Sequence, residues 1–206
     1  MNPLLIIGTV IWLYVLTVLK RTQLMAYFFI IGSVGLFFIL ITLSNPYWVW
    51  FFTHMVIQGV KGFGLITGMC TVMSKYGAVH IISGNLSSLL MTIDYECSGI
   101  IETSAFAALV LFFPAYSKKE RLFYVVLGTI WIYLANVIRL IIVVIIVHYF
   151  GYSAFFLAHT IIGRLVFYGL VIALYYNIFT YSQLSQGLYN RFKSTFLTRK
   201  GSGAHD

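Results

Sequence analysis

The sequence predicts an all-α polytopic membrane protein with about five transmembrane helices, further interfacial or re-entrant helices and a small extracellular β-hairpin. Of its 206 residues, 61% are hydrophobic and only 9% are charged, whereas a soluble domain has about 45–50% apolar and about 25% charged residues. Aromatic residues make up 18%, which suits the Trp and Tyr belts found at membrane surfaces. This composition excludes a soluble globular, a disordered or a nucleic-acid-binding protein, in spite of the net charge of +8.

Five apolar runs approach the ~20 residues that a helix needs to cross a bilayer. They cover roughly residues 3–19, 23–43, 98–114, 122–149 and 155–179. We expect the first run to be a retained helix and not a cleaved signal peptide. No basic segment precedes it, and Lys20 and Arg21 follow it, which is the wrong flank for cleavage.

The basic residues predict how these runs are oriented, because Lys and Arg are enriched in cytoplasmic loops. Nine of the thirteen lie in three groups between or after the runs: Lys20 and Arg21; Lys118, Lys119 and Arg121; Arg191, Lys193, Arg199 and Lys200. If all three groups are cytoplasmic, the N-terminus is outside and the third run enters from outside near Cys97. The fourth run then returns outward, and the fifth goes back inward from His159.

Residues 46–96 must then begin and end outside. The segment 46–73 is interrupted by glycines, His54 and Lys61, so we expect interfacial or re-entrant helices there and not another crossing. Residues 76–95 contain two short β-type runs around Gly84-Asn85, the pattern of a hairpin turn. The sequence therefore predicts a small extracellular hairpin just before Cys97.

Four ionisable residues lie within the later runs: Glu102, Arg139, His159 and Arg164. Each costs about 2.5–3.5 kcal/mol at the centre of a membrane helix, so such residues are functional candidates. At 1.5 Å per residue, Arg139 lies roughly 25 Å beyond Leu122, in the outer part of the membrane. Cys97 and His159 begin their runs at the same outer level. Three helices thus deliver a thiol, a guanidinium and an imidazole to one depth.

These three groups suit acyl transfer. A thiolate is a strong nucleophile, and nearby cations and helix N-termini favour it. A histidine can hold a proton and return it to a leaving amine, and an arginine can stabilise an oxyanion. The pattern therefore predicts catalytic roles for Cys97, Arg139 and His159, with attack on a peptide carbonyl and a thioester intermediate.

Other polar residues have supporting or structural interpretations. Asn136 lies on the same helix face as Arg139 and could orient it or bind the substrate backbone, while Ser98 follows the cysteine directly. Glu102 could pair with Arg139 or Arg164, and Arg164 could belong to an inner structural ion pair. A lone cysteine in an apolar protein is often a small buried side chain, which is how we interpret Cys70. We also expect His54, His80 and His148 to be structural, and Asp94 and Glu96 to face solvent.

Three strings of this chain resemble motifs of the exosortase/archaeosortase family of integral membrane proteins: Glu96-Cys97-Ser98-Gly99-Ile100, Ala135-Asn136-Val137-Ile138-Arg139, and His159 with Ile161-Ile162-Gly163. The resemblance covers roughly residues 45–180, and the small size is similar to the compact exosortase G type. It implies Cys97 as nucleophile with Arg139 and His159 as its partners. It also implies that the substrate is an exported protein with a C-terminal transmembrane sorting tail. Arg164 departs from the pattern, because many relatives have an aromatic residue there.

These expectations divide the chain into four parts. Two transmembrane helices occupy 1–45, interfacial helices and the hairpin 46–96, and a three-helix catalytic core 97–180. A basic cytoplasmic tail follows at 181–206, and its end, 201–206, resembles an artificial linker. We expect a multi-pass protein of the cell membrane whose active site faces the extracellular side.

The residues leave other functions open. A thiol-based membrane acyltransferase with a lipid-linked donor would use the same three groups. A haem- or quinone-binding subunit would need paired histidines at one depth, and a transporter would need no catalytic cysteine. We find no spacing typical of metal ligands and no phosphate-binding loop, so no cofactor or metal is implied. The expected partners are membrane lipid, the tail-bearing protein and an unknown nucleophilic acceptor, with no nucleic acid.

Overall fold

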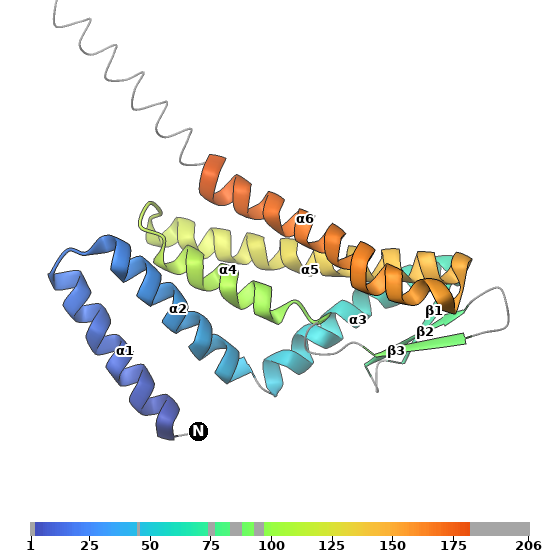
Figure 1. Ribbon diagram of the computed structural model, residues 1–206, viewed down its shortest axis with the longest axis horizontal. Coiled ribbons are helices and arrows are strands. Elements are labelled where there is room, and N and C mark those ends of the chain that lie inside the picture. The colour runs from blue at the N-terminus through green and yellow to red at the C-terminus, as the bar shows by residue number, and fades with distance from the viewer. Residues whose placement is uncertain (1–2, 45, 74–76, 83–87, 93–96, 182–206) are drawn as a thin grey trace, which may run out of the picture. The chain divides into compact units, whose positions relative to one another are not determined.

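The structure, a computed structural model, describes residues 3–44, 46–73, 77–82, 88–92 and 97–181 (Figure 1). The chain separates into two compact units, Met1–Phe167 and Tyr168–Asp206. The first unit contains the elements from α1 to the start of α6. In its described part, the second contains the rest of α6 and a π-helical turn, Tyr176–Tyr181.

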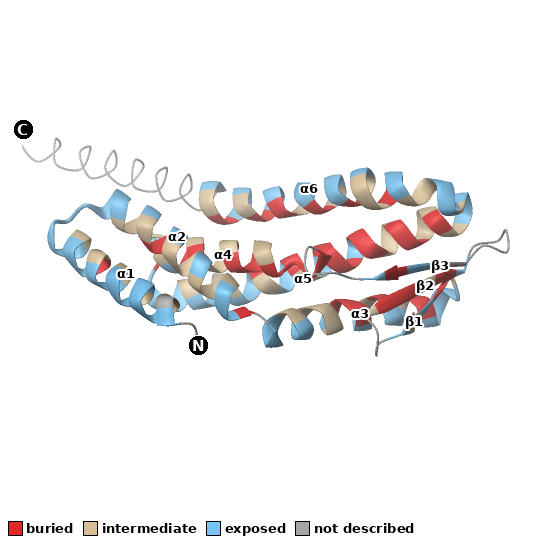
Figure 2. Ribbon diagram, turned by 60° about the horizontal axis from the view of Figure 1, so that its bottom comes forward, coloured by how far each residue is buried: buried red, intermediate tan, exposed pale blue. Residues whose placement is uncertain are grey.

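The first two helices, α1 (Pro3–Arg21) and α2 (Met25–Ser44), form a hairpin (Figure 1). The Trp12 indole lies against Gly35 and donates to the carbonyl of Ile31 at 2.9 Å. Figure 2 shows that most of α1 is exposed. A helix that is apolar on all sides and yet exposed within its own chain is typical of a lipid-facing segment.

Helix α4 (Ile100–Phe112) packs against α2 and against α5 (Lys118–Phe150). A capping box starts α5, because Ser117 and Glu120 each accept a hydrogen bond from the other's backbone N–H. The close approach of α4 and α5 depends on Gly128, where an added Cβ would lie 2.0 Å from the ring of Phe106. Small residues allow this kind of contact between membrane helices.

Helix α3 (Tyr47–Thr67) is one continuous helix that ends at Gly68, whose φ of 69° is left-handed. Strand β1 (Cys70–Met73) follows, so the prediction of helical structure as far as residue 73 is wrong. Hydropathy alone did not distinguish a short strand from a helix end. Helix α3 contacts the second half of α5, where Gly59 faces Val137.

Strands β2 (Ala78–Ile82) and β3 (Ser88–Thr92) pair antiparallel, with Ile82 opposite Ser88. This confirms the predicted strand pairing, although the Gly84-Asn85 turn lies outside the described residues. Strand β1 pairs with the other side of β2, giving the order β1-β2-β3. The small sheet therefore has one strand more than the sequence predicted.

The predicted helix at 155–179 is irregular in the structure. A 3₁₀ turn at Tyr152–Ala154 leads into a π-helical segment at Leu157–Ile162, and α6 (Gly163–Tyr175) follows. π-Helical turns are rare and occur frequently at functional sites. This one contains His159.

Among the described residues, four helical stretches are long and apolar enough to cross a membrane: α2, α3, α5 and Tyr152–Thr180. Helix α4, with 13 residues, is shorter than the predicted run at 98–114. A mainly helical membrane protein with a small β-sheet is confirmed. By length and composition α3 also qualifies as a span, although the sequence favours an interfacial or re-entrant position. The predicted tail lies outside the described residues, except for its first residue, Tyr181.

The buried core lies where α3, the sheet and the second half of α5 meet. It includes Ile57 from α3, Ile81 from β2 and Val144 from α5, all fully buried. Cys97 belongs to the same cluster. The core thus surrounds the segment that the sequence predicted to carry the chemistry.

Candidate functional site

Cys97 lies in the turn that leads into α4, three residues before the helix begins. Gly99 has a φ of 75°, a left-handed conformation that favours glycine. The hydroxyl of buried Ser98 accepts a 3.4 Å hydrogen bond from the N–H of Ile100. This tight turn holds the Cys97 side chain against the core with 7% of its surface exposed.

Asn136 on α5 fixes this turn from the opposite side. Its Nδ2 donates a 2.6 Å hydrogen bond to the carbonyl of Cys97, and its side chain is fully buried. Its Oδ1 has no partner among the described residues. An added Cβ at Gly99 would lie 3.4 Å from Nδ2, an ordinary contact distance, so the requirement for glycine here comes from its left-handed backbone.

Arg139 lies nearly one helical turn after Asn136 and is 5% exposed. Its Nη2 donates to Sγ of Cys97 at 3.7 Å. The guanidinium also lies over the ring of Phe167, 5.7 Å from the ring centre, which is within cation–π range. Its Nε has no partner in the described part of the chain.

His159 approaches the sulfur from another element. Its Nε2 lies 3.5 Å from Sγ of Cys97, and the π-helical turn places the ring there. Phe155, four residues earlier, stacks on the imidazole at 5.4 Å between ring centres. The structure therefore brings together all three residues predicted to be catalytic.

Two neighbours of the site were not predicted, Phe155 and Phe167, and Gly163 was noted only as part of the motif string after His159. An added Cβ at Gly163 would lie 3.3 Å from Cγ of Arg139 and 3.0 Å from the carbonyl of Ala158, so this glycine makes room for the arginine. The i, i+4 spacing of Phe155 and His159 could have indicated their contact. Nothing in the sequence links Phe167 to Arg139.

The remaining supporting candidates are less closely involved. Glu102 is half-buried in the first turn of α4 and feels the charge of Arg139, but the two form no ion pair in the described structure. Arg164 is exposed and takes part in no ion pair among the residues described. Of the four supporting candidates, Asn136 makes the most direct contact with the site.

Comparison with known families agrees with this geometry. The family model described as transmembrane exosortase matches residues 1–176. This chain belongs to the transmembrane exosortase family. No curated protein and no solved structure matches it. The match includes all three motif strings that carry the resemblance, whereas the compact G type remains a prediction.

The other histidines in the described part of this exosortase have protein partners. Nδ1 of His54 lies 2.9 Å from the carbonyl of Trp50, and that of His80 lies 3.3 Å from the hydroxyl of Thr71. His148 bonds to the carbonyl of Ile82. Within the described ranges, no group of three or more His, Cys, Asp or Glu side chains could hold a metal ion.

The second thiol of the exosortase, Cys70, is on β1 and is 3% exposed. Burial raises the pKa of its thiol, because an apolar environment disfavours the charged form. Gly64 of α3 packs directly against it. Cys70 is therefore a buried side chain packed against α3.

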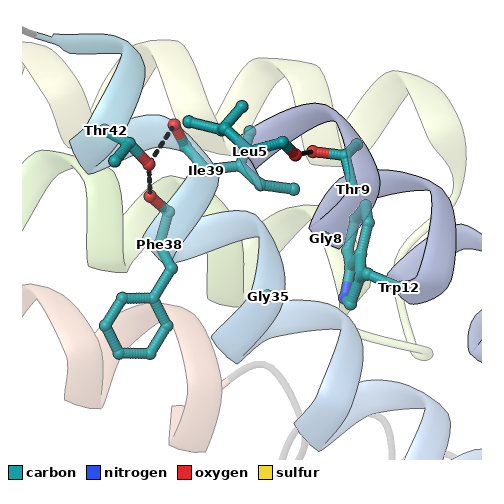
Figure 3. A pocket seen from close by; sticks show the side chains of 8 residues that line it. All are labelled: Leu5, Gly8, Thr9, Trp12, Gly35, Phe38, Ile39 and Thr42. Carbon is teal, nitrogen blue, oxygen red and sulfur yellow. Dashed lines mark hydrogen bonds between the residues drawn. The ribbon is translucent and has the colours of Figure 1, made fainter. Parts of the chain in front are cut away.

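Two apolar cavities lie in the first unit. One, of about 410 Å³, is lined by residues of α2, α3, α4 and α5, including Ile100 and Thr103 close to the Cys97 turn. The other, of about 430 Å³, lies between α1 and α2 (Figure 3). Its hydroxyl groups, on Thr9 and Thr42, bond to carbonyls of their own helices. The walls of this second cavity are therefore apolar.

Proposed function

We propose that this exosortase is a membrane-embedded cysteine protease or transpeptidase that cleaves a C-terminal sorting signal from exported proteins. The observation that carries the proposal is the position of the Cys97 sulfur, 3.5 Å from the His159 imidazole and 3.7 Å from the Arg139 guanidinium. A nucleophile within reach of a base and a fixed cation is the arrangement that covalent acyl transfer requires.

The chemistry proceeds in two steps. Sγ of Cys97 attacks the scissile carbonyl carbon, and the negative charge that develops on the oxygen is stabilised by Arg139. The carbon–nitrogen bond breaks, and His159 gives the proton taken from the thiol to the leaving amine. An amine acceptor or water then attacks the thioester, gives up a proton, and Cys97 leaves as the thiol.

Asn136 and Gly163 hold this machinery in place. The amide of Asn136 donates to the carbonyl of the nucleophile at 2.6 Å, and Gly163 leaves room for the Arg139 side chain. The buried Oδ1 of Asn136 and Nε of Arg139 have no partners among the described residues. Both atoms are therefore available to a substrate peptide group, because buried polar atoms normally have partners.

Position along α5 supports a site at the outer surface of the cell membrane. Arg139 is 18 residues after Arg121, or roughly 27 Å along a helix, close to the ~30 Å thickness of the hydrocarbon core. The end of α2 and the start of α4 line the same cavity through Ser44 and Ile100. The segment between Ser44 and Ile100 therefore begins and ends at a similar depth in the membrane. A segment that stays on the outer side would do the same.

The test is to trap the intermediate. The chain is co-expressed with candidate tail-bearing proteins, and the Cys97 peptide is analysed by mass spectrometry before and after hydroxylamine, which cleaves thioesters. A polypeptide released from Cys97, together with a shortened tail protein, supports the proposal. A released fatty acyl group instead supports a thiol-based acyltransferase, for which the apolar cavity beside Ile100 would hold the chain. Tail processing that survives Cys97→Ala contradicts both.

A further inference from the structure

The sheet has two edges with different surroundings. Strand β1 forms one edge, and the carbonyl of Cys70 lies so close to α3 that a Cβ at Gly64 would be 2.5 Å from it. Strand β3 forms the other edge and pairs with β2 on one side. No strand pairs with its other side in the described part of the chain. Within the described residues, the β3 edge is therefore open.

The alternation of hydrogen-bonding directions along β2 shows which backbone groups of β3 face this open edge. The N–H of Ile82 donates to the carbonyl of Met69 at 3.0 Å, so the backbone of Ile82 faces the β1 side. Facing groups alternate along a strand, so Ile81 faces β3, where its partner is Leu89. The N–H and C=O of Leu90, the next residue, therefore point toward the open edge.

Among the described residues, the β3 edge also lacks the charges and prolines that often protect an edge strand. Natural edges are blocked by Lys, by Pro, by bulges or by a covering element. Residues 88–92 read Ser-Leu-Leu-Met-Thr, with neither charge nor proline. The side chain of Leu90 is 57% exposed. An unprotected edge of this kind is suited to pairing with an extended peptide.

This edge is tied to the nucleophile by the chain itself. Thr92, the last residue of β3, precedes Cys97 by five residues, which span at most about 18 Å even when fully extended. Met91 of β3 and Val79 of β2 share one buried cluster with Cys97. A peptide paired with β3 would therefore need only about five extended residues to reach the sulfur.

We propose that the extended substrate segment next to the scissile bond adds to β3 as a fourth strand. This inference rests on the proposed function and assigns the surface that positions its substrate. Main-chain hydrogen bonds to Leu90 supply sequence-independent affinity, and alternate side chains of the peptide contact the sheet. The occupant is an extended polypeptide, because only a strand satisfies a row of backbone donors and acceptors.

The test uses Leu90→Pro. Proline removes the outward N–H of Leu90 but no bond to β2, and edge strands tolerate proline at such positions. The probe is a synthetic peptide that spans the cleavage junction of the tail protein found by co-expression. We expect kcat/KM to fall by about tenfold or more, since one hydrogen bond is lost and the ring obstructs the incoming strand. Leu90→Ala keeps the N–H and should stay within about threefold of the unchanged chain.

The alkylation rate of Cys97 by iodoacetamide serves as the control for folding and intrinsic reactivity, and should be equal in both variants. Cleavage by Leu90→Pro at the unchanged rate overturns the proposal. So does an equal loss in Leu90→Pro and Leu90→Ala, which would assign the effect to the side chain.

A second experiment leaves the protein unaltered. Peptides N-methylated at successive backbone nitrogens on the side paired with β3 are compared as substrates. Strand addition predicts that cleavage is lost at every second position, because alternate N–H groups face the sheet. If cleavage is lost without this period of two, strand addition is contradicted but the proposed function is not. If the unmethylated peptide and the tail protein are both left uncleaved, the proposed function itself fails, and the β3 assignment with it.

Discussion

Helices α2 and α5 are both strongly apolar, yet they do different things in this molecule. About 11% of the apolar window of α2 is buried within the chain, against 50% of that of α5. Helix α5 carries Asn136 and Arg139, buried polar residues that contact Cys97. On α2, the buried hydroxyl of Ser33 has no partner among the described residues. Hydropathy thus identifies both as membrane helices. Buried polar groups with specific partners distinguish α5, which contributes to the candidate site, from α2.

The largest expected effect comes from removing the nucleophile. Cys97→Ala should lower tail processing by at least about 10³-fold, because no other described thiol lies near His159 and Arg139. Immunoblotting of the tail protein measures the change. Ser33→Ala on α2 is the matched control and should leave processing unchanged, since its hydroxyl makes no hydrogen bond in the described structure. Equal effects of the two substitutions would contradict the different roles assigned to α2 and α5.

Arg139→Lys should reduce processing by about 10²–10³-fold, the cost of losing an oxyanion-stabilising donor. Lysine keeps the charge but lacks the planar group that contacts both the sulfur and Phe167. The matched control is Arg164→Lys, because Arg164 is exposed and should tolerate the change. Initial cleavage rates measure both variants. Near-normal activity of Arg139→Lys would mean that charge alone suffices.

A smaller effect is expected from substitutions that change packing at a buried and at an exposed helix position. Gly128→Ala places a Cβ 2.0 Å from the buried ring of Phe106 and should destabilise the protein by about 1–3 kcal/mol. Gly8→Ala on α1 meets nothing within 4 Å and should be neutral or slightly stabilising, because alanine favours helix more than glycine does. Thermal unfolding in detergent, followed by tryptophan fluorescence, compares their Tm values. A Tm for Gly128→Ala equal to that for Gly8→Ala would show that the α4–α5 contact is not tight.

The smallest effect concerns the two thiols. Burial raises the pKa of Cys70, so its reactive thiolate appears only at more alkaline pH than for an ordinary cysteine. In the Cys97→Ala variant we therefore expect little iodoacetamide labelling at neutral pH and an increase as the pH is raised. Peptide mass spectrometry measures the labelled fraction. Substantial labelling of Cys70 at neutral pH would contradict its position in the core.

The sequence by itself determined the membrane class, because long apolar runs have few other stable environments. It also singled out the candidate residues Cys97, Arg139 and His159, because ionisable groups are costly in lipid and are seldom present there without a role. Two short strands within 76–95 were predicted around the Gly84-Asn85 turn signal, and the structure pairs residues 78–82 with 88–92.

Only the tertiary structure decided how these parts combine. A common depth could be counted along the helices, but lateral contact between Cys97, Arg139 and His159 depends on how three segments pack. The left-handed Gly99, the π-helical turn around His159 and the space at Gly163 create that contact, and none of them follows from hydropathy. Strand β1 was missed for the same reason: its four residues pair with β2 through backbone hydrogen bonds, whose partners a local pattern does not specify.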